Sequence, residues 1–158
     1  MSEQALTTKD QTNFVEFNFA ELKTRFDSAL SNGQRAEIRR VRDPDELDWL
    51  PSFYRLLPTG AHADRQWRRI IFLLPFARQT DGAASLGAQL AKAKVSEARL
   101  FQIIRSNYPN DFLYLRRILQ QVQPSLDWQQ FGKMLYYWGD NTKRHILEDY
   151  FLAAKPEK

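Results

Sequence analysis

Arginines are the side chains of this sequence best suited to bind a charged partner, and they outnumber lysines 15 to 8. A guanidinium presents a planar fork of N–H donors that matches a phosphate group, and it stays charged at neutral pH. Residues 61–144 hold 13 basic and 6 acidic side chains, a net charge of +7, whereas residues 1–60 have a net charge of −2. This distribution favours a polyanionic partner, although arginines paired with local carboxylates would give the same count.

Two predicted helices, residues 96–105 and 111–122, carry four of these arginines. Their apolar side chains recur at helical spacing, which marks one face of each helix for burial. Ser96 is suited to cap the first helix, and Asn110 or Asp111 the second, because these side chains accept hydrogen bonds from first-turn amides. A Tyr-Pro pair between the helices predicts a turn. The arginines that burial does not explain are Arg99, Arg105, Arg116 and Arg117.

Further basic side chains gather at two other places in the sequence. Arg39, Arg40 and Arg42 lie within four positions, and pairing with neighbouring acids explains them as well as phosphate contact does. Lys143 and Arg144 open the last predicted helix, where cations oppose the positive end of the helix dipole. That placement favours an external anion over a stabilising role.

No group of residues predicts catalysis. The two histidines, His62 and His145, lack acidic partners at metal-ligand spacing, and the absence of cysteine excludes a thiolate site. The glycines form no nucleotide-binding fingerprint. Acidic pairs at residues 45–46 and 148–149 are explained by helix-start electrostatics and by a solvated helix face. We therefore expect no catalytic residue, no cofactor and no metal site.

Helical periodicity dominates the chain and no segment alternates with a period of two, so we predict an all-α fold of about seven to nine short helices without strands. Gly33 is expected to end the first helix in the left-handed conformation. Small side chains at and after Gly87 should let another helix pack closely, and residues 79–84 should form a loop. The other predicted helices span residues 14–30, 43–57 with a break at Pro51, 64–76, 85–91, 128–138 and 142–153, while residues 34–41 are helical or extended.

We expect two small helical lobes that together form one elongated subunit. The predicted division is a disordered leader at residues 1–13, an N-terminal lobe at 14–94, a C-terminal lobe at 95–154 and a tail at 155–158. The longest apolar run is far shorter than the roughly 20 residues that a membrane span needs. The polar start of the chain lacks the apolar core of a secretory signal, so we expect a cytoplasmic protein without membrane contact.

Two classes of function fit these residues. One is a helical nucleic-acid-binding module that follows a phosphate backbone, and the other is a DNA-binding regulator in which residues 97–105 and 111–122 form a helix-turn-helix. The turn is longer than the usual three or four residues. The second helix also places Phe112, Leu115 and Ile118 where base-reading polar side chains should stand, which weakens the regulator hypothesis. An enzyme is the third alternative.

An ordered set of short motifs resembles a known family, the small subunit of the type I-E CRISPR surveillance complex Cascade, called CasB. No single motif is diagnostic, but their order and separations over about residues 20–152 are similar to those of the family. The motifs are IRRV at 38–41, PDEL at 44–47, PSFYRL at 51–56, SLG at 85–87, LA at 90–91, RLFQIIR at 99–105, LRRIL at 115–119, LDW at 126–128, ML at 134–135, WG at 138–139 and LEDYF at 147–151.

The resemblance implies an all-helical, two-lobed, non-catalytic subunit of an RNA-guided complex in antiviral defence. Its expected partners are the other Cascade subunits with their guide RNA, the target DNA with its displaced strand, and a second copy of itself in a head-to-tail pair. Basic surface on such a subunit lies along the DNA and stabilises the R-loop. Carried over motif by motif, the nucleic-acid-binding residues are Arg39, Arg40, Arg99, Arg105, Arg116 and Arg117, and more loosely Lys143 and Arg144.

The sequence departs from the family pattern at two places. Residues 79–84 form a shorter and less basic connection than in relatives, which puts DNA contact by this loop in doubt. Asp140 and Asn141 stand where more positive charge is expected, which weakens the assignment of Lys143 and Arg144.

Arg116 and Arg117 are neighbours on a helix whose other residues are mostly apolar. Burying an unpaired guanidinium is too costly, so at least one of the two is expected to be exposed or specifically paired. We predict that replacing both by alanine weakens target binding by the assembled complex, uniformly over target sequences, and leaves the fold intact.

Overall fold

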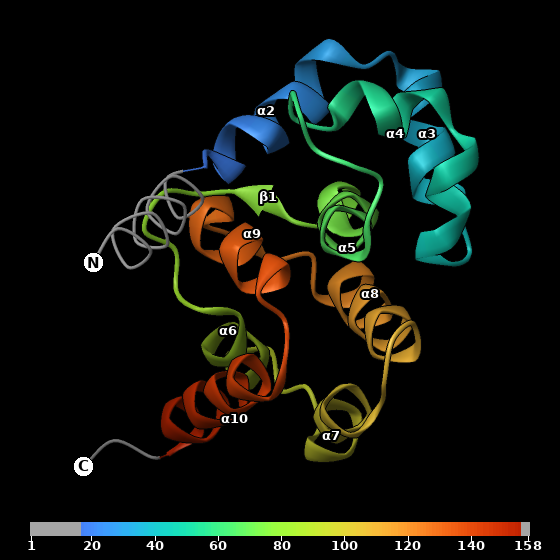
Figure 1. The fold of residues 1–158 in the computed structure, drawn as a ribbon. Coiled ribbons are helices and arrows are strands. Elements are labelled where there is room, and N and C mark those ends of the chain that lie inside the picture. Colours follow the sequence, from blue (N-terminus) through green and yellow to red (C-terminus); the bar gives the residue numbers. More distant parts are fainter. Residues whose placement is uncertain (1–16, 156–158) are drawn as a thin grey trace, which may run out of the picture.

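The computed structural model describes residues 17–155, which fold into nine α-helices, two 3-10 helices and two strands of two residues each (Figure 1). The all-α prediction is confirmed. The predicted leader, the first three residues of the predicted helix 14–30 and the last three residues of the predicted tail lie outside the described range. No helix in that range is long and apolar enough to span a membrane. The elements are α2 (Phe19–Ala29), α3 (Asn32–Arg40), η1 (Pro44–Trp49), α4 (Pro51–Leu56), α5 (Arg65–Leu73), η2 (Leu74–Phe76), β1 (Arg78–Gln79), α6 (Leu86–Lys92), α7 (Glu97–Arg105), α8 (Asn110–Val122), β2 (Ser125–Leu126), α9 (Trp128–Tyr136) and α10 (Asp140–Ala154).

Caps and prolines begin most helices where the sequence predicts them. The side chains of Ser85, Ser96 and Asp127 accept hydrogen bonds of 3.0 to 3.4 Å from first-turn amides of α6, α7 and α9. These amides have no partner within their own helix. Pro44 and Pro51 stand at the start of η1 and α4, where the missing N–H and the fixed φ of proline are favourable.

The predicted helix end at Gly33 is wrong. Ser31 and Gln34 form a capping box, in which the Ser31 hydroxyl accepts from the Gln34 amide at 3.1 Å and the Gln34 side-chain oxygen accepts from the Ser31 amide at 2.8 Å. This reciprocal pair begins a helix. Gly33 therefore lies in the first turn of α3, and α2 ends earlier, at Ala29.

The predicted N-cap position of α8 is also wrong. Pro109, which has no side-chain acceptor, is the N-cap. Asp111 lies inside the first turn, where its carboxylate accepts from the Phe112 amide at 2.9 Å, and it is only 2% exposed. The Asp111 carboxylate accepts from the Trp138 indole N–H at 2.9 Å. Asp111 is thus a buried acceptor that joins α8 to the segment between α9 and α10, a role that no local pattern signals.

The prediction of no strands is wrong at one place. β1 pairs in parallel with β2, with Arg78 opposite Ser125 and Gln79 opposite Leu126. Strands of two residues are too short to produce an alternating pattern in the sequence. The predicted loop after β1 is tied to the start of α9, because Gly82 N donates to an Asp127 carboxylate oxygen at 3.0 Å.

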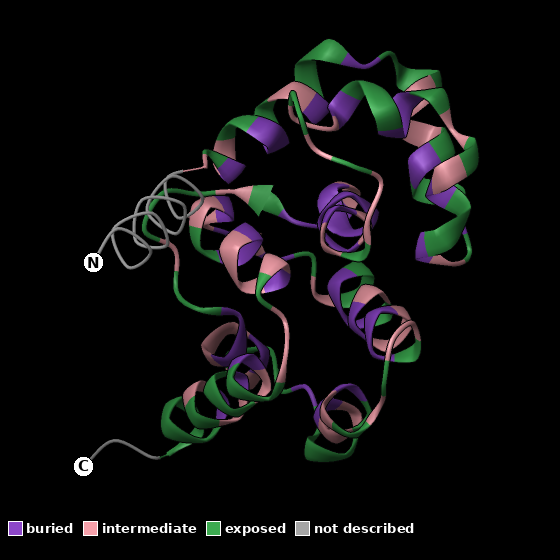
Figure 2. Cartoon of the chain, viewed as in Figure 1, coloured by how far each residue is buried: buried purple, intermediate pink, exposed green. Residues whose placement is uncertain are grey.

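The core is centred on α5, whose apolar circumference predicts burial. Residues 70–73 have no exposed surface, and α5 is buried around most of its circumference in Figure 2. Trp128, Phe131 and Leu135, which lie at helical spacing, form the buried face of α9. A single hydrophobic cluster contains residues from α2 through α10, so helices of both predicted lobes share one core. The lobe boundary at residues 94–95 stays a prediction.

Two glycines let pairs of helices touch. A Cβ atom added at Gly87 would overlap the carbonyl oxygen of Ile146 in α10, and one at Gly132 would lie 2.5 Å from Cβ of Phe19 in α2. The prediction that small side chains near Gly87 allow close packing is therefore confirmed. α6 and α10 lie side by side in Figure 1.

Candidate nucleic-acid interface

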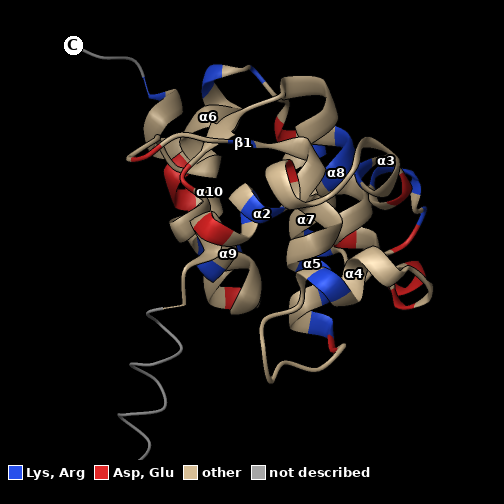
Figure 3. Ribbon diagram, turned by 90° about the horizontal axis from the view of Figure 1, so that it is seen from above, with Lys and Arg blue, Asp and Glu red and all other residues tan. Residues whose placement is uncertain are grey.

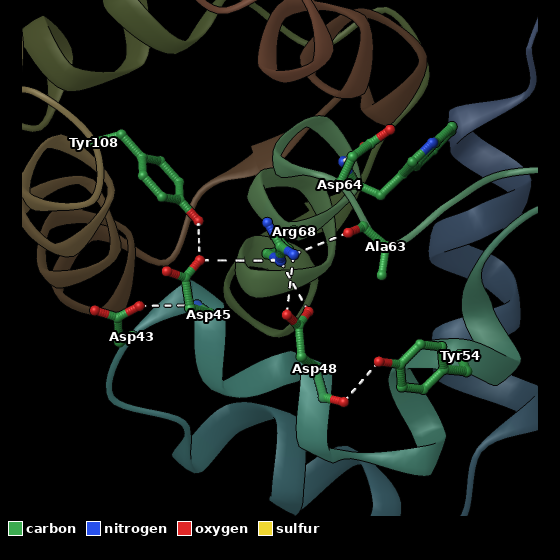
Figure 4. Close-up of polar contacts among 9 residues, drawn as sticks. Asp43, Asp45, Asp48, Tyr54, Ala63, Asp64, Arg68 and Tyr108 are labelled. Atoms are coloured by element: carbon green, nitrogen blue, oxygen red, sulfur yellow. Dashed lines mark hydrogen bonds and ion pairs between the residues drawn. The ribbon is translucent and has the colours of Figure 1, made fainter.

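Several basic side chains are engaged inside the protein and are unavailable to phosphate. Arg68 of α5 binds both carboxylate oxygens of Asp48, at 2.9 and 3.0 Å, and donates to Ala63 O at 2.9 Å. Asp45 lies 4.0 Å from Arg68 and accepts from the Tyr108 hydroxyl at 2.9 Å (Figure 4). The hydrogen bond to Asp48 is the main cause that raises the pKa of Arg68. This network joins α5 and η1 to the turn before α8.

Arg69 closes the C-terminal end of α9. Only 8% exposed, it donates to Leu135 O at 2.8 Å and to Tyr136 O at 2.7 Å. The last carbonyls of a helix lack intrahelical donors, and a cation is favourable at this end of the dipole. Burial lowers the pKa of Arg69, and the nearby Asp111 opposes that effect.

Arg116, one of the predicted site residues, is held by the fold. Its guanidinium donates to the carbonyl oxygens of Val41 and, at 3.4 Å, of Arg42, and lies 4.6 Å from the centre of the Phe72 ring. Burial, followed by repulsion from Arg117, lowers its pKa. Arg116 thus ties α8 to the C-terminal end of α3 and to the core helix α5.

Arg116→Ala is expected to lower the free energy of unfolding by about 2 kcal/mol, since it removes charge-assisted hydrogen bonds and a cation–π contact. Arg117→Ala is the matched control, and we expect a change within about 0.5 kcal/mol because Arg117 is exposed. Urea unfolding followed by circular dichroism measures both. Equal midpoints for the two variants would contradict a structural role for Arg116. Replacing Arg116 and Arg117 together is therefore expected to destabilise the protein, which differs from the sequence-based expectation that the fold stays intact. A loss of target binding by that double variant could not be separated from its loss of stability.

Lys143 also has internal partners. Its Nζ donates to Ser106 O at 2.8 Å and lies 3.7 Å from a carboxylate oxygen of the buried Asp111. It thereby joins α10 to the segment between α7 and α8. Arg144 is exposed, and its guanidinium makes one contact of 3.5 Å, with the Asn141 side chain.

Three predicted site residues are free to meet a ligand. Arg39, Arg40 and Arg117 are exposed, and their guanidinium groups form no hydrogen bond, ion pair or ring contact with another described residue. α3 and α8 adjoin through the contacts of Arg116, and both helices carry basic residues in Figure 3. We call Arg39, Arg40, Arg117 and the exposed Arg78 of β1 the α3–α8 basic surface.

Arg99 and Arg105 lie on α7, which packs on the side of α8 away from α3 (Figure 1). Arg99 is half-buried and donates to the Gln121 side-chain oxygen. Arg105 is exposed, with its guanidinium 4.7 Å from the centre of the Phe101 ring. The structure therefore does not gather all the predicted arginines on one face.

Arg39 also borders a cleft of about 350 Å³. We call it the α3–α8 cleft, since α3 and the C-terminal half of α8 form two of its walls. The polar and aromatic side chains that line it are Lys23, Arg39, Phe76, Arg78, Gln120 and Gln123.

Sequence reasoning missed Lys23 and Arg78. Lys23 stands four residues after Phe19 and three before Phe26, so helical spacing places it on the buried face of α2, a signal that was present in the sequence. Its Nζ donates to Leu74 O at 2.9 Å. Arg78 has no comparable signal, because it belongs to a strand too short to predict.

The N-terminal turn of α8 argues against a helix-turn-helix regulator. Residues at the start of a recognition helix must reach base edges. In α8 both Asp111 and Phe112 are buried, at 2% and 0% exposure. Leu115, Ile118 and Leu119 also face the core, so α8 is a core element with Arg117 at its surface.

Metal binding has no support in the described part of the chain. Residues 17–155 contain no group of three or more histidine, aspartate or glutamate side chains placed to hold a metal ion. The exposed arginines of the candidate site instead provide positive charge that can bind phosphate groups.

Comparisons with known proteins cover every candidate arginine. The sequence model of the family described as CRISPR-associated protein Cse2 (CRISPR_cse2) matches residues 34–151. The CRISPR system Cascade subunit CasB of Escherichia coli (strain K12) is 39% identical over 141 residues, which cover 79% of this chain and 88% of that protein. A chain in the crystal structure of E. coli Cascade bound to a PAM-containing double-stranded DNA target is 36% identical with a TM-score of 0.81, over 88% of this chain and 97% of that one. The chain belongs to the CRISPR-associated Cse2 family.

Proposed function

We propose that this protein is a non-catalytic subunit of an RNA-guided Cascade complex, in which exposed arginines bind the nucleic-acid backbone and stabilise the R-loop on target DNA. The observation that carries the proposal is the structural likeness to a chain of DNA-bound E. coli Cascade, at a TM-score of 0.81 over 88% of this chain. A chain of the same fold and similar size can take the corresponding position in an assembly.

The free arginines fit a role that requires no base reading. In a Cas9-type complex, base pairing with the guide RNA supplies sequence specificity. The RNA–DNA hybrid that forms is about as stable as the DNA duplex that it replaces, so the free energy of R-loop formation is close to zero. We extend this argument to Cascade. Phosphate contacts by Arg39, Arg40 and Arg117 would then tip the balance toward the open R-loop. Each such contact to a single strand contributes about −0.7 to the slope of log affinity against log salt.

Exposed aromatic and apolar side chains support assembly with protein partners. Trp49 is 86% exposed and Tyr54 48%, on neighbouring elements η1 and α4, while Leu152 near the end of α10 is 57% exposed. Large apolar side chains in water are commonly covered in a complex. We propose that other Cascade subunits with guide RNA, or a second copy of this chain, cover them.

Co-expression tests the proposed function. The full chain, produced with the other subunits of a type I-E complex and a guide RNA, is expected to co-elute with the ribonucleoprotein particle through affinity and size-exclusion steps. The particle should bind target DNA less tightly when this chain is left out. A folded, monodisperse chain that never joins the particle would contradict the proposal.

A further inference from the structure

We propose that the α3–α8 cleft binds one unpaired nucleotide of a single-stranded nucleic acid, with the phosphate held by Lys23, Arg39 and Arg78. The inference rests on the proposed function, since it names the form of nucleic acid that the α3–α8 basic surface receives. Three cations line this one cleft from three separate elements, α2, α3 and β1, and none of the described residues that line it is acidic.

Lys23 is the buried cation of the cleft, at 5% exposure. Its ammonium group donates to Leu74 O at 2.9 Å and lies 3.2 Å from the Asp27 carboxylate. An ammonium has three N–H donors, so one remains without an oxygen or nitrogen acceptor among the described residues. Burial is the largest cause that lowers the pKa of Lys23, the charge and hydrogen bond of Asp27 oppose it, and repulsion from Arg39 and then Arg35 lowers the pKa further. An anion in the cleft would relieve this repulsion.

The two arginines retain donors for a ligand. The Arg39 guanidinium has no hydrogen bond or ion pair with another described residue. Arg78 uses Nε for Ser125 Oγ at 3.3 Å and Nη2 for Gln123 O at 3.2 Å. A guanidinium has five N–H donors, so Arg78 is oriented by these bonds and still has donors to spare.

The rest of the lining suits a nucleoside. Phe76 and Leu119 provide apolar surface, and the side-chain amides of Gln120 and Gln123 offer donors and acceptors to a base or sugar. The cleft volume of about 350 Å³ lies at the lower end of the range for small-molecule sites, roughly 300–1,000 Å³. That size is sufficient for one nucleotide.

The concave shape of the cleft favours single-stranded over double-stranded nucleic acid. A base enters a concave site only after it leaves its stack and its partner, which costs a few kcal/mol in a duplex and least in a single strand. A displaced or unpaired strand can therefore place a nucleotide in the cleft, whereas an intact duplex can contact only the rim.

Nuclear magnetic resonance titration of the full chain tests the proposal. Thymidine 5′-monophosphate should shift the backbone amides of Gln120 and Gln123 saturably, with weaker affinity for thymidine and for inorganic phosphate. A single-stranded oligothymidylate should compete at lower concentration than a duplex of equal length. Arg39→Gln is expected to weaken mononucleotide binding about tenfold, the effect of one charge-assisted hydrogen bond.

Arg55→Gln is the matched control, because it removes the same charge from an exposed position of α4 outside the cleft lining and outside the α3–α8 basic surface. We expect less than about a twofold change in mononucleotide affinity. Arg78→Gln supplies a second cleft variant, expected to weaken binding like Arg39→Gln. No shift at millimolar mononucleotide, equal binding of phosphate and mononucleotide, or equal affinities of Arg39→Gln and Arg55→Gln would each overturn the proposal. These outcomes do not depend on co-elution with Cascade subunits, so failure of the cleft and failure of the proposed function are distinguishable.

Discussion

Replacing Arg39, Arg40 and Arg117 together by glutamine is expected to weaken target-DNA binding by the assembled complex about tenfold. Each exposed ion contact contributes roughly 0.5 kcal/mol, and three together correspond to about this factor. The slope of log affinity against log salt should become less steep by about 2, because three phosphate contacts to a single strand are lost. The loss should be the same for every target sequence, since phosphate contacts carry no sequence information. Filter binding or electrophoretic mobility shift over a range of salt concentrations measures both quantities.

A charge-matched control separates these contacts from a general effect of net charge. Arg55, Lys92 and Lys155 are exposed, form no hydrogen bond or ion pair with another described residue through their side chains, and lie outside the candidate site. Their joint replacement by glutamine removes the same charge and should leave the salt slope nearly unchanged. If both triple variants lose affinity equally, long-range charge rather than the α3–α8 basic surface explains binding.

Gly87→Ala is expected to lower the free energy of unfolding by about 3 kcal/mol, the upper part of the range for overpacking. The added methyl group would overlap the backbone carbonyl oxygen of Ile146 and stand 2.9 Å from Asp149 Cβ and 3.0 Å from Tyr150 N. Two of these three atoms belong to the backbone of α10, which cannot move aside like a flexible side chain. α6 and α10 would have to separate, and chemical denaturation measures the loss.

Gly33→Ala makes the same chemical change at an open position. The nearest atom to an added Cβ there is Ser31 Oγ, at 3.9 Å. Since Gly33 lies in a helix, alanine should stabilise the protein by up to about 1 kcal/mol. The two variants should therefore move the denaturation midpoint in opposite directions, and a shared direction would contradict the packing argument.

Local chemistry explains which parts of the fold the sequence predicted. The caps formed by Ser85, Ser96 and Asp127 can be predicted because a cap and the amide that it binds lie within three residues of each other. The burial of residues 70–73 can be predicted because a helix that is apolar around most of its circumference must be buried, whichever helices surround it. The error at Gly33 had a local cause as well. Ser31 followed by Gln34 is a capping-box signal for a helix start, and it outweighed the glycine.

The candidate site was predictable only in part. The resemblance selected segments rich in arginine, and the exposed Arg39, Arg40 and Arg117 remain candidates for nucleic-acid contact. Arg116 and Lys143 looked the same in sequence, yet the fold gives them carbonyl and carboxylate partners. The α3–α8 cleft could not be foreseen, because its walls come from segments far apart in the chain.

The sequence by itself determined an all-α chain of the Cse2 family with a surplus of arginine, because helical periodicity, caps and ordered motifs are local properties. Tertiary structure alone decided which guanidinium groups are free. The Arg116 guanidinium donates to Val41 O across 75 positions of the chain, while the guanidinium of the adjacent Arg117 is exposed and forms no hydrogen bond or ion pair with a described residue. The physical reason is that a buried cation needs acceptors, and acceptors at such separations are brought close only when the helices pack.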